Sequence, residues 1–365
     1  MKELSVEADR KNLLKVQAFI DEELEKAGCP MLTQTTIDVA VEEIFVNIAS
    51  YAYSQESGTA VIQLTMYEDP PAVEIIFIDD ASTDCSPAVM EQFAVESGFP
   101  AQIIRQTENR GVAAARNCGL DAANGDWLAF VDADDTLEPT ALETAISAIS
   151  TEVDIIGWDW TLGFEKNGRY MRQADYSTPL QALQNLMGGT MRWNLWLFLI
   201  RRELIEQNGI RFIDGTNMAE DMQFMIKSFC AANHTVQVHE ALYRYNALSS
   251  SSISRQFSDE RRAEITTNLE EATSAVIRSP YAEALAPFIQ YLKLFLKLPL
   301  LIGSDRNNYQ LWYNWFPEAN AFATSNKALP LRTRLLQGMA ARRLWWGVRL
   351  YYYLIYKFVY GLLFR

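Results

Sequence analysis

Two apolar segments that each end in a cluster of aspartates constrain this chain more than any other feature. Residues 74–80 read EIIFIDD, and residues 127–135 read WLAFVDADD. Between them the pattern predicts a helix after Pro87, a strand at 102–105 and a helix at 112–122. Such alternation of strands and helices implies right-handed crossovers and a parallel sheet. Ligands of such sheets bind beyond the carboxyl ends of the strands, where both acidic clusters fall.

Asp132 and Asp134 stand two residues apart at the end of the second apolar strand, so both side chains leave the sheet on one face. Two carboxylates this close repel each other unless a cation lies between them. Mg²⁺ and Mn²⁺ prefer oxygen ligands and commonly bridge a carboxylate to substrate phosphates. The pair therefore predicts a metal-diphosphate site, in which the cation offsets charge on a departing phosphate. The alternative is a solvated acidic turn in which Asp135 caps the next helix.

Several motifs, in order along the chain, resemble the family 2 glycosyltransferases of GT-A fold. EIIFIDDASTD (74–84) and TENRGVAAARNCGLDAANGDWLAFVDADD (107–135) resemble the nucleotide-binding half of that family. RRELIEQNGIRF, MAEDMQF and ALYRYNALSSSSIS are similar to its acceptor-side half, so the resemblance spans about residues 73–255. It implies an α/β fold with a Rossmann-type, mainly parallel sheet flanked by helices. It also implies transfer of a sugar from a nucleotide-sugar donor to an acceptor hydroxyl with inversion, in cell-surface polysaccharide or glycan assembly.

The resemblance implies a role for each of five residues on the donor side. Asp80 matches the acidic position that holds the nucleotide base or ribose, and Asp79 lies beside it as a supporting partner. Asp132 and Asp134 match the DxD motif, with Asp134 as the ligand of Mg or Mn and Asp132 as a sugar or ribose contact. Arg116 is expected to supply positive charge near the phosphates. Its alternative is a surface helix residue paired with an acid.

Asp221, in MAEDMQF, matches the catalytic base of the family's ED motif. It would take the acceptor proton while the metal stabilises the diphosphate leaving group. Without the resemblance, an acid in the first turn of a helix is explained by the helix dipole alone. The motifs together imply a metal-dependent transferase that uses a nucleotide sugar, such as a UDP-sugar, and a glycan or lipid-linked acceptor.

The first 80 residues resemble a different family. AVEEIFVNIASYAY (40–53), on a helix expected at 35–50, resembles the first ATP-binding motif of anti-sigma-factor serine kinases, in the histidine-kinase-like ATPase superfamily. Glu43 and Asn47 match the base and the magnesium-binding amide of that motif. An ATP site also needs glycine turns around the phosphates, and residues 1–80 supply none. The motif is therefore expected to be inactive, with both side chains as exposed positions on a packed helix.

The chain thus resembles a chimera whose two parts join at IFIDD. The expected domains are an ATPase-like fragment at 1–72, a GT-A core at 73–260 and a helical C-terminal region at 261–365. The transferase family normally opens with an apolar parallel strand that is absent here. A strand at 61–67 is expected to pair antiparallel with the strand at 73–78 in its place, with weakened donor binding. The alternatives to an active transferase are an anti-sigma-type regulatory binding protein and a catalytically impaired fusion.

Charge is distributed unevenly along the chain. The net charge is −14, which argues against nucleic acid as a partner because phosphate neutralisation needs clustered Lys and Arg. Residues 319–365 nevertheless hold eight basic residues and no acid. The four cysteines show no CxxC spacing, and no signal peptide is recognised. These features predict a cytoplasmic protein.

The aromatic and basic tail suggests contact with a membrane surface. The segment 344–364 holds nine aromatic residues, but Arg349 and Lys357 interrupt its apolar run. Two central charges disfavour a spanning helix and favour an interfacial one, so residues 331–365 are expected to meet anionic lipid at the inner face of the cell membrane. The alternative is a helical hairpin packed on the catalytic domain.

Overall fold

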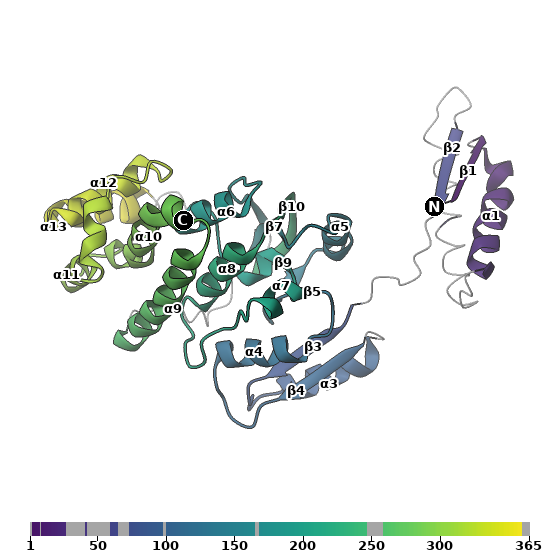
Figure 1. Cartoon of the computed structure of the whole chain (residues 1–365), viewed down its shortest axis with the longest axis horizontal. Coiled ribbons are helices and arrows are strands. Elements are labelled where there is room, and N and C mark those ends of the chain that lie inside the picture. The colour runs from purple at the N-terminus through teal and green to yellow at the C-terminus, as the bar shows by residue number, and fades with distance from the viewer. Residues whose placement is uncertain are drawn as a thin grey trace. The chain divides into compact units, whose positions relative to one another are not determined.

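The computed structural model describes most of the chain. The described residues are 2–7, 9–26, 41, 59–64, 73–97, 100–164, 168–246 and 258–359. The chain divides into two compact units, Met1–Val73 and Glu74–Arg365, each held together by contacts among its own residues (Figure 1). Apart from Val41, the helix expected at 35–50 lies outside the described residues, and so do Glu43 and Asn47.

The first unit contains a small sheet and one long helix. Strand β1 (Lys2–Glu7) pairs antiparallel with β2 (Thr59–Leu64) over six residue pairs. Helix α1 (Leu13–Lys26) buries Val16, Ile20 and Leu24 in a cluster that also holds Val6 of β1. The spacing of Val16, Ile20 and Leu24 in the sequence is typical of such an amphipathic helix.

The expected pairing of strand 61–67 with strand 73–78 is wrong. Every described residue of β2 pairs with β1, and β3 (Ile75–Asp79) pairs with β4 (Ala101–Arg105) instead. The physical reason is that β1, together with the apolar face of α1, gives β2 a partner inside its own unit. Strand β1 was not predicted, because its sequence KELSVE contains three charged residues and therefore does not resemble a typical strand.

The second unit begins with a two-stranded parallel sheet. β3 and β4 pair in register from Ile75 with Ala101 to Asp79 with Arg105. Helix α3 (Ser86–Glu96) connects these strands, and α4 (Val112–Ala122) follows β4 and packs on β3. The strands and helices predicted between 74 and 122 are therefore present.

A larger mixed sheet follows, in the order β5–β9–β7–β10–β6, with β8 paired to β7. The parallel pair is β7 with β10, whereas β9 runs antiparallel to both β5 and β7. The expected α/β fold is confirmed, although the strands divide into two sheets and the larger one is mixed. The bounds are β5 (Trp127–Ala129), β6 (Thr136–Leu137), β7 (Ile155–Gly163), β8 (Gly168–Met171), β9 (Phe198–Arg201) and β10 (Thr235–Asn246).

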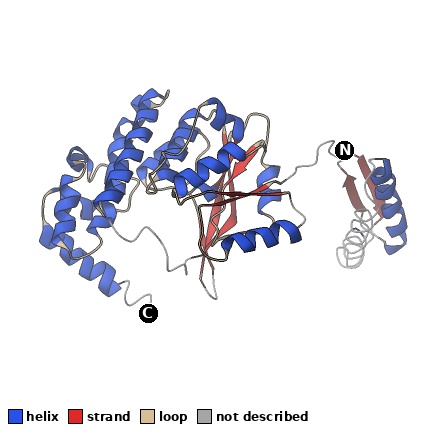
Figure 2. Ribbon diagram, turned by 90° about the horizontal axis from the view of Figure 1, so that it is seen from below, coloured by secondary structure: helices blue, strands red, loops and turns tan. Residues whose placement is uncertain are grey.

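Helices cover this larger sheet, as Figure 2 shows for the second unit. α8 packs against α6 and α9, and Phe229 of α8 meets Phe198 of β9 edge-to-face at 5.6 Å between ring centroids. Both rings are fully buried, so the helix and the sheet share one apolar core. The bounds are α5 (Ala141–Ser147), α6 (Pro179–Gly188), α7 (Arg202–Gln207), α8 (Glu220–Ala231) and α9 (Asp259–Arg278).

The C-terminal region is helical, as predicted. It contains α10 (Ala282–Lys297), α11 (Arg306–Asn314), α12 (Leu331–Ala341), α13 (Trp345–Tyr351) and a π-helical stretch at Tyr352–Val359. α10 packs on α6 and so joins this region to the core. Within the described chain, one segment, Ala282–Leu301, is long and apolar enough to cross a membrane, and 44% of its apolar window is buried inside the protein.

Candidate active site

Asp80 ties the end of β3 to the start of α4. Its carboxylate accepts hydrogen bonds from the backbone N–H groups of Arg110 and Gly111, both at 2.8 Å. Gly111 precedes α4 with φ +86°, and a Cβ there would lie 2.3 Å from Asn217 Oδ1, so the position requires glycine. The predicted donor-binding carboxylate therefore sits at a helix N-terminus, held by main-chain donors.

Asp79 lies one residue earlier and is buried, with 4% of its surface exposed. It accepts a hydrogen bond from the backbone N–H of Ser82 at 2.9 Å. Hydrogen bonds from the hydroxyl and the backbone of Ser82 hold the pKa of Asp79 below its usual value. Asp79 thus fixes the turn after β3, which agrees with a supporting role.

Arg116 of α4 gathers three acids that are far apart in the sequence. Its Nη1 lies 2.8 Å from Glu220 Oε1 and 2.5 Å from Asp221 Oδ1, and its Nη2 lies 3.7 Å from Asp132 Oδ1. The guanidinium also lies 5.6 Å from the centre of the Phe212 ring. The structure therefore brings Arg116, Asp132 and Asp221 together from α4, the end of β5 and the start of α8.

Arg116 was expected either to supply positive charge near the phosphates or to pair with an acid on a surface helix, and the geometry has features of both. It is paired with acids, as the alternative interpretation required, yet its side chain is only 15% exposed and lies among the residues matched to the donor and base positions. One guanidinium faces three carboxylates in a partly buried space. The cluster therefore carries excess negative charge, which a bound cation or proton would relieve.

Proton affinity in the cluster is raised accordingly. Burial raises the pKa of Asp132 to about 6, and Arg116 opposes this rise. Burial also raises the pKa of Glu220, and repulsion from Asp221 adds to that rise. The cluster is thus prepared to hold a proton near neutral pH.

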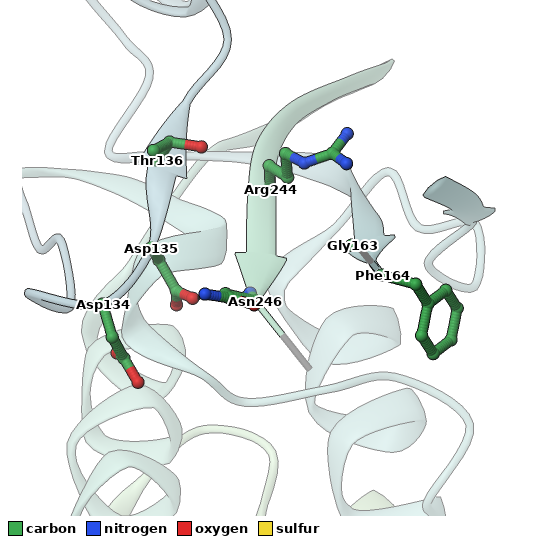
Figure 3. Close-up of a pocket in the computed structure, with 7 residues that line it drawn as sticks. All are labelled: Asp134, Asp135, Thr136, Gly163, Phe164, Arg244 and Asn246. Atoms are coloured by element: carbon green, nitrogen blue, oxygen red, sulfur yellow. Dashed lines mark hydrogen bonds between the residues drawn. The ribbon is translucent and has the colours of Figure 1, made fainter. Parts of the chain in front are cut away.

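A cavity of about 200 Å³ is lined by Asp134 and Asp135, which follow Asp132 in the sequence (Figure 3). Figure 3 shows Asp134 and Asp135 on one side, and Arg244 with Asn246 on the neighbouring strand. Its lining residues are Asp134, Asp135, Thr136, Gly163, Phe164, Arg244 and Asn246.

The two aspartates of this cavity differ in their partners. Asp135 accepts hydrogen bonds from the Tyr243 hydroxyl at 2.8 Å and from the Asn246 backbone at 2.7 Å. Tyr243 in turn accepts a hydrogen bond from the backbone N–H of Asp132 at 3.1 Å. Asp134 is exposed and has no hydrogen bond or ion pair with any residue that the structure describes. Asp135 is therefore a structural carboxylate of the loop rather than a helix cap, and Asp134 is free to take a ligand.

The oxygen donors at this place fit a hard cation. Asp134 and the half-exposed Asp132 offer carboxylate oxygens, which Mg²⁺ and Mn²⁺ prefer. In the described part of the chain, no group of three or more His, Cys, Asp or Glu side chains is arranged to hold a metal. A cation here would have one or two protein ligands and would complete its shell with substrate phosphates and water.

Sequence reasoning assigned no role to four residues of this region. Glu220 precedes Asp221 in MAEDMQF, and Tyr243, Arg244 and Asn246 all stand in ALYRYN. The guanidinium of Arg244 has no hydrogen bond or ion pair within the described residues. A polar run that ends an apolar strand was the available signal, since such ends face ligands in α/β sheets.

Comparison with known proteins finds a family match that overlaps this region. Residues 54–227 match the family model described as glycosyl transferase family 2. Residues 54–227, slightly less than half of the chain, are thus similar to this family. The match starts before the expected domain boundary at 73, and the resemblance of the N-terminal part to anti-sigma kinases stays a prediction.

Relatives with known names agree with this family. A protein named as a glycosyltransferase, EpsH of Bacillus subtilis, is 32% identical over 192 residues, which cover 50% of this chain and 55% of that protein. The succinoglycan biosynthesis protein ExoO of Rhizobium meliloti is 26% identical over 230 residues, which cover 60% and 64% of the two chains. The chain thus spans about half the length of several named relatives that it matches.

Solved structures with a similar fold also exist. The structure of S. aureus TarS 1-349 in complex with UDP-GlcNAc matches with a TM-score of 0.58 and 19% identity, covering 79% of this chain and 83% of that one. This likeness shows a shared glycosyltransferase fold.

Proposed function

We propose that this chain is a metal-dependent, inverting glycosyltransferase. It would transfer a sugar from a nucleotide-sugar donor to an acceptor hydroxyl in polysaccharide or glycan assembly. The observation that carries the proposal is the cluster of Arg116 with Asp132, Glu220 and Asp221 beside the unpartnered carboxylate of Asp134. The family match and the names of EpsH and ExoO support the reaction class. TarS bound to UDP-GlcNAc supports a UDP-sugar as the donor.

The donor would lie along the ends of β3 and β5. Asp80, supported by Asp79, would contact the base or ribose, and Asp132 would contact the ribose or sugar. Asp134 would hold Mg or Mn, which when bound neutralises charge on the diphosphate leaving group. Because Asp134 has no partner among the described residues, it can take this ligand without breaking an existing contact.

Asp221 would act as the general base. The acceptor oxygen attacks the anomeric carbon, the bond from that carbon to the diphosphate oxygen breaks, and the acceptor proton passes to Asp221. In the free protein this carboxylate is held by Arg116 at 2.5 Å. A bound diphosphate would attract the same guanidinium, which would free Asp221 to take the proton of the acceptor hydroxyl. The base would therefore become active mainly when the donor is present.

The test of this assignment compares a variant of the ED motif with a control variant outside it. Asp221→Asn should lower turnover by about 10²–10⁴-fold while nucleotide-sugar binding, measured by calorimetry, stays within about threefold. Asp175→Asn, an exposed aspartate outside the cluster, is the matched control and should leave turnover unchanged. Turnover of Asp221→Asn close to that of the unaltered protein would remove the base assignment.

Metal dependence has a separate test that does not require turnover. Binding of UDP followed by calorimetry should need added Mn²⁺ or Mg²⁺ and should weaken by about tenfold or more in Asp134→Asn. Metal-independent binding of equal strength in both proteins would contradict the role of Asp134.

A catalytically impaired fusion is the alternative that one observation favours. β2 pairs with β1 rather than with β3, so within the described residues β3 has a ladder partner on one edge alone, β4. Contacts that a neighbouring strand end would make with the nucleotide are then lost. We therefore expect UDP-sugars to bind more weakly than micromolar, and calorimetry that gives micromolar affinity would exclude the impaired form. Binding of a sigma factor or its antagonist by residues 1–80 would instead favour the regulatory alternative.

The acceptor and the cellular location belong to the same proposal. The acceptor would be a glycan or a lipid-linked glycan, met at the inner face of the cell membrane through residues 331–365. The protein would then be cytoplasmic and peripheral to the membrane.

A further inference from the structure

The end of the helical region exposes three large apolar side chains in a row. Trp346 is 72% exposed, Leu350 is 50% exposed and Leu354 is 52% exposed. They stand four residues apart along α13 and the π-helical stretch, so they share one side of the helix. The neighbouring residues Gly347 and Val348 are buried against the protein. We name the exposed row the Trp346 face.

Cations without acidic partners accompany this face. Arg342, Arg343 and Arg349 are exposed, and residues 319–365 contain no acid. Arg343 lies over the Tyr313 ring at 4.1 Å and Arg349 over the Tyr353 ring at 5.9 Å, so aromatic side chains accompany two of the three guanidinium groups. Among the described residues, none of the three forms an ion pair with a carboxylate. Residues 319–365 therefore carry a positive charge although the whole protein is acidic.

We propose that the Trp346 face docks on a lipid bilayer whose surface carries anionic headgroups. An amphipathic helix with aromatic and aliphatic residues on one side and arginines beside them binds in the interfacial plane. Tryptophan is favoured at headgroup depth, and each arginine gains from the negative surface potential. The face rests on the membrane contact proposed for residues 331–365, and it is independent of the transfer reaction.

Charge decides between a membrane and a second copy of the chain. A twofold symmetric contact would place the same surface on both sides, so the arginines of one copy would face those of the other. Residues 319–365 offer no acid to compensate them. An anionic lipid surface provides that compensation and also accepts the apolar row.

The test uses the full chain in sedimentation with vesicles. Vesicles of phosphatidylcholine are compared with vesicles containing about one third phosphatidylglycerol, at low and high salt. The double variant Trp346→Ser with Leu350→Ser should sediment at least about tenfold less with the anionic vesicles. A matched control, Val95→Ser with Ile277→Ser, also removes two exposed apolar side chains, 84% and 63% exposed, and should bind as the unaltered protein does.

Each outcome bears on one part of the proposal. Equal sedimentation of the double variant and its control would overturn the Trp346 face. If Arg342→Ser with Arg343→Ser abolishes binding while the double variant still binds, the membrane contact stands and the assigned face is wrong. Equal binding to both vesicle types overturns the requirement for anionic lipid. A dimer in light scattering that the double variant disperses would show that the face joins two copies. Leu354→Ser repeats the test if the double variant fails to fold.

Discussion

The apolar side chains of β3 and those of β7 meet different surroundings within the same unit. Ile75, Ile76, Phe77 and Ile78 of β3 all remain partly exposed, whereas the first six residues of β7 are buried. The helices differ in the same way, because α3 buries no residue and α8 buries eight. The larger sheet therefore supplies most of the apolar core of this unit. The β3–β4 pair depends on hydrogen bonds and on partly exposed contacts with α3 and α4.

This difference separates the two halves of the candidate site. The expected donor contacts Asp79 and Asp80 stand on the thinly covered pair, while Glu220 and Asp221 begin a helix that is packed on the larger sheet. Segments with few buried contacts open at lower free energy than core segments. The donor half is thus expected to be the softer half, with Arg116 as its main polar link to the base.

The largest expected effect comes from matched truncations of phenylalanine in the two regions. Phe229→Ala removes a fully buried ring and should lower the free energy of unfolding by about 3–5 kcal/mol. Phe93→Ala removes a ring that is 39% exposed on α3 and should cost about 1 kcal/mol. Urea unfolding followed by fluorescence measures both values. Similar costs at the two sites would show that the β3–β4 pair is packed as tightly as the larger sheet.

The next effect concerns arginines with different surroundings. Arg116→Met leaves three carboxylates without their cation and should cost about 3 kcal/mol at pH 8. The cost should shrink at pH 5, because protonation of Asp132 and Glu220 then relieves the repulsion. Arg105→Met in β4 removes an exposed ion pair with Glu91 and should cost less than about 1 kcal/mol. A loss for Arg116→Met that does not change with pH would contradict a charge-based link.

A smaller effect is expected where Asp80 joins β3 to α4. Asp80→Asn replaces one acceptor oxygen by an N–H donor that faces a backbone N–H, which should cost about 1–3 kcal/mol. Hydrogen exchange should accelerate in β3 and β4 and remain unchanged in β7. Asp84→Asn is the control. Asp84 accepts a hydrogen bond from the backbone N–H of Ser86 at 2.9 Å, which lies at the start of α3 and does not join β3 to α4. Equal acceleration in β7 would mean that the two sheets open together.

Local sequence patterns correctly predicted individual helices and strands of the second unit. Helix α4 occupies 112–122 as its apolar spacing indicated, and both acidic clusters follow strands. The pairing of β2 was predicted wrongly, because strand partners depend on contacts between distant segments. Lys2 pairs with Leu64 across more than sixty residues, and no local pattern specifies that register.

The same contrast between local patterns and distant contacts applies to the candidate site. Asp132, Asp134 and Asp221 were predicted from short motifs, and the role of Asp221 came from the family resemblance alone. Arg116 donates a hydrogen bond to Asp221, which lies 105 residues later in the sequence. Neither the sequence around Arg116 nor that around Asp221 predicts this contact. Arg244 was missed for the same reason, since its place in the cavity follows from the pairing of β10 with both β6 and β7.

The smallest effect expected is a pair of opposite pH dependences at the ends of β3 and β5. Burial raises the pKa of Asp132 to about 6, so between about pH 4 and 6 the folded state binds a proton that the unfolded state lacks. Its contribution to stability is therefore present below pH 4 and is lost as the pH rises through 6. Asp79 has a lowered pKa because Ser82 donates to it, so its contribution is present above pH 4 and is lost as the pH falls below that value. Thermal unfolding from pH 3 to 8 should show that Asp132→Asn gains stability relative to the unaltered protein as the pH rises, whereas Asp79→Asn falls behind. The Asp132 effect should be small because its side chain is 41% exposed, and slopes of the same sign in both variants would mean that the two strand ends share one electrostatic environment.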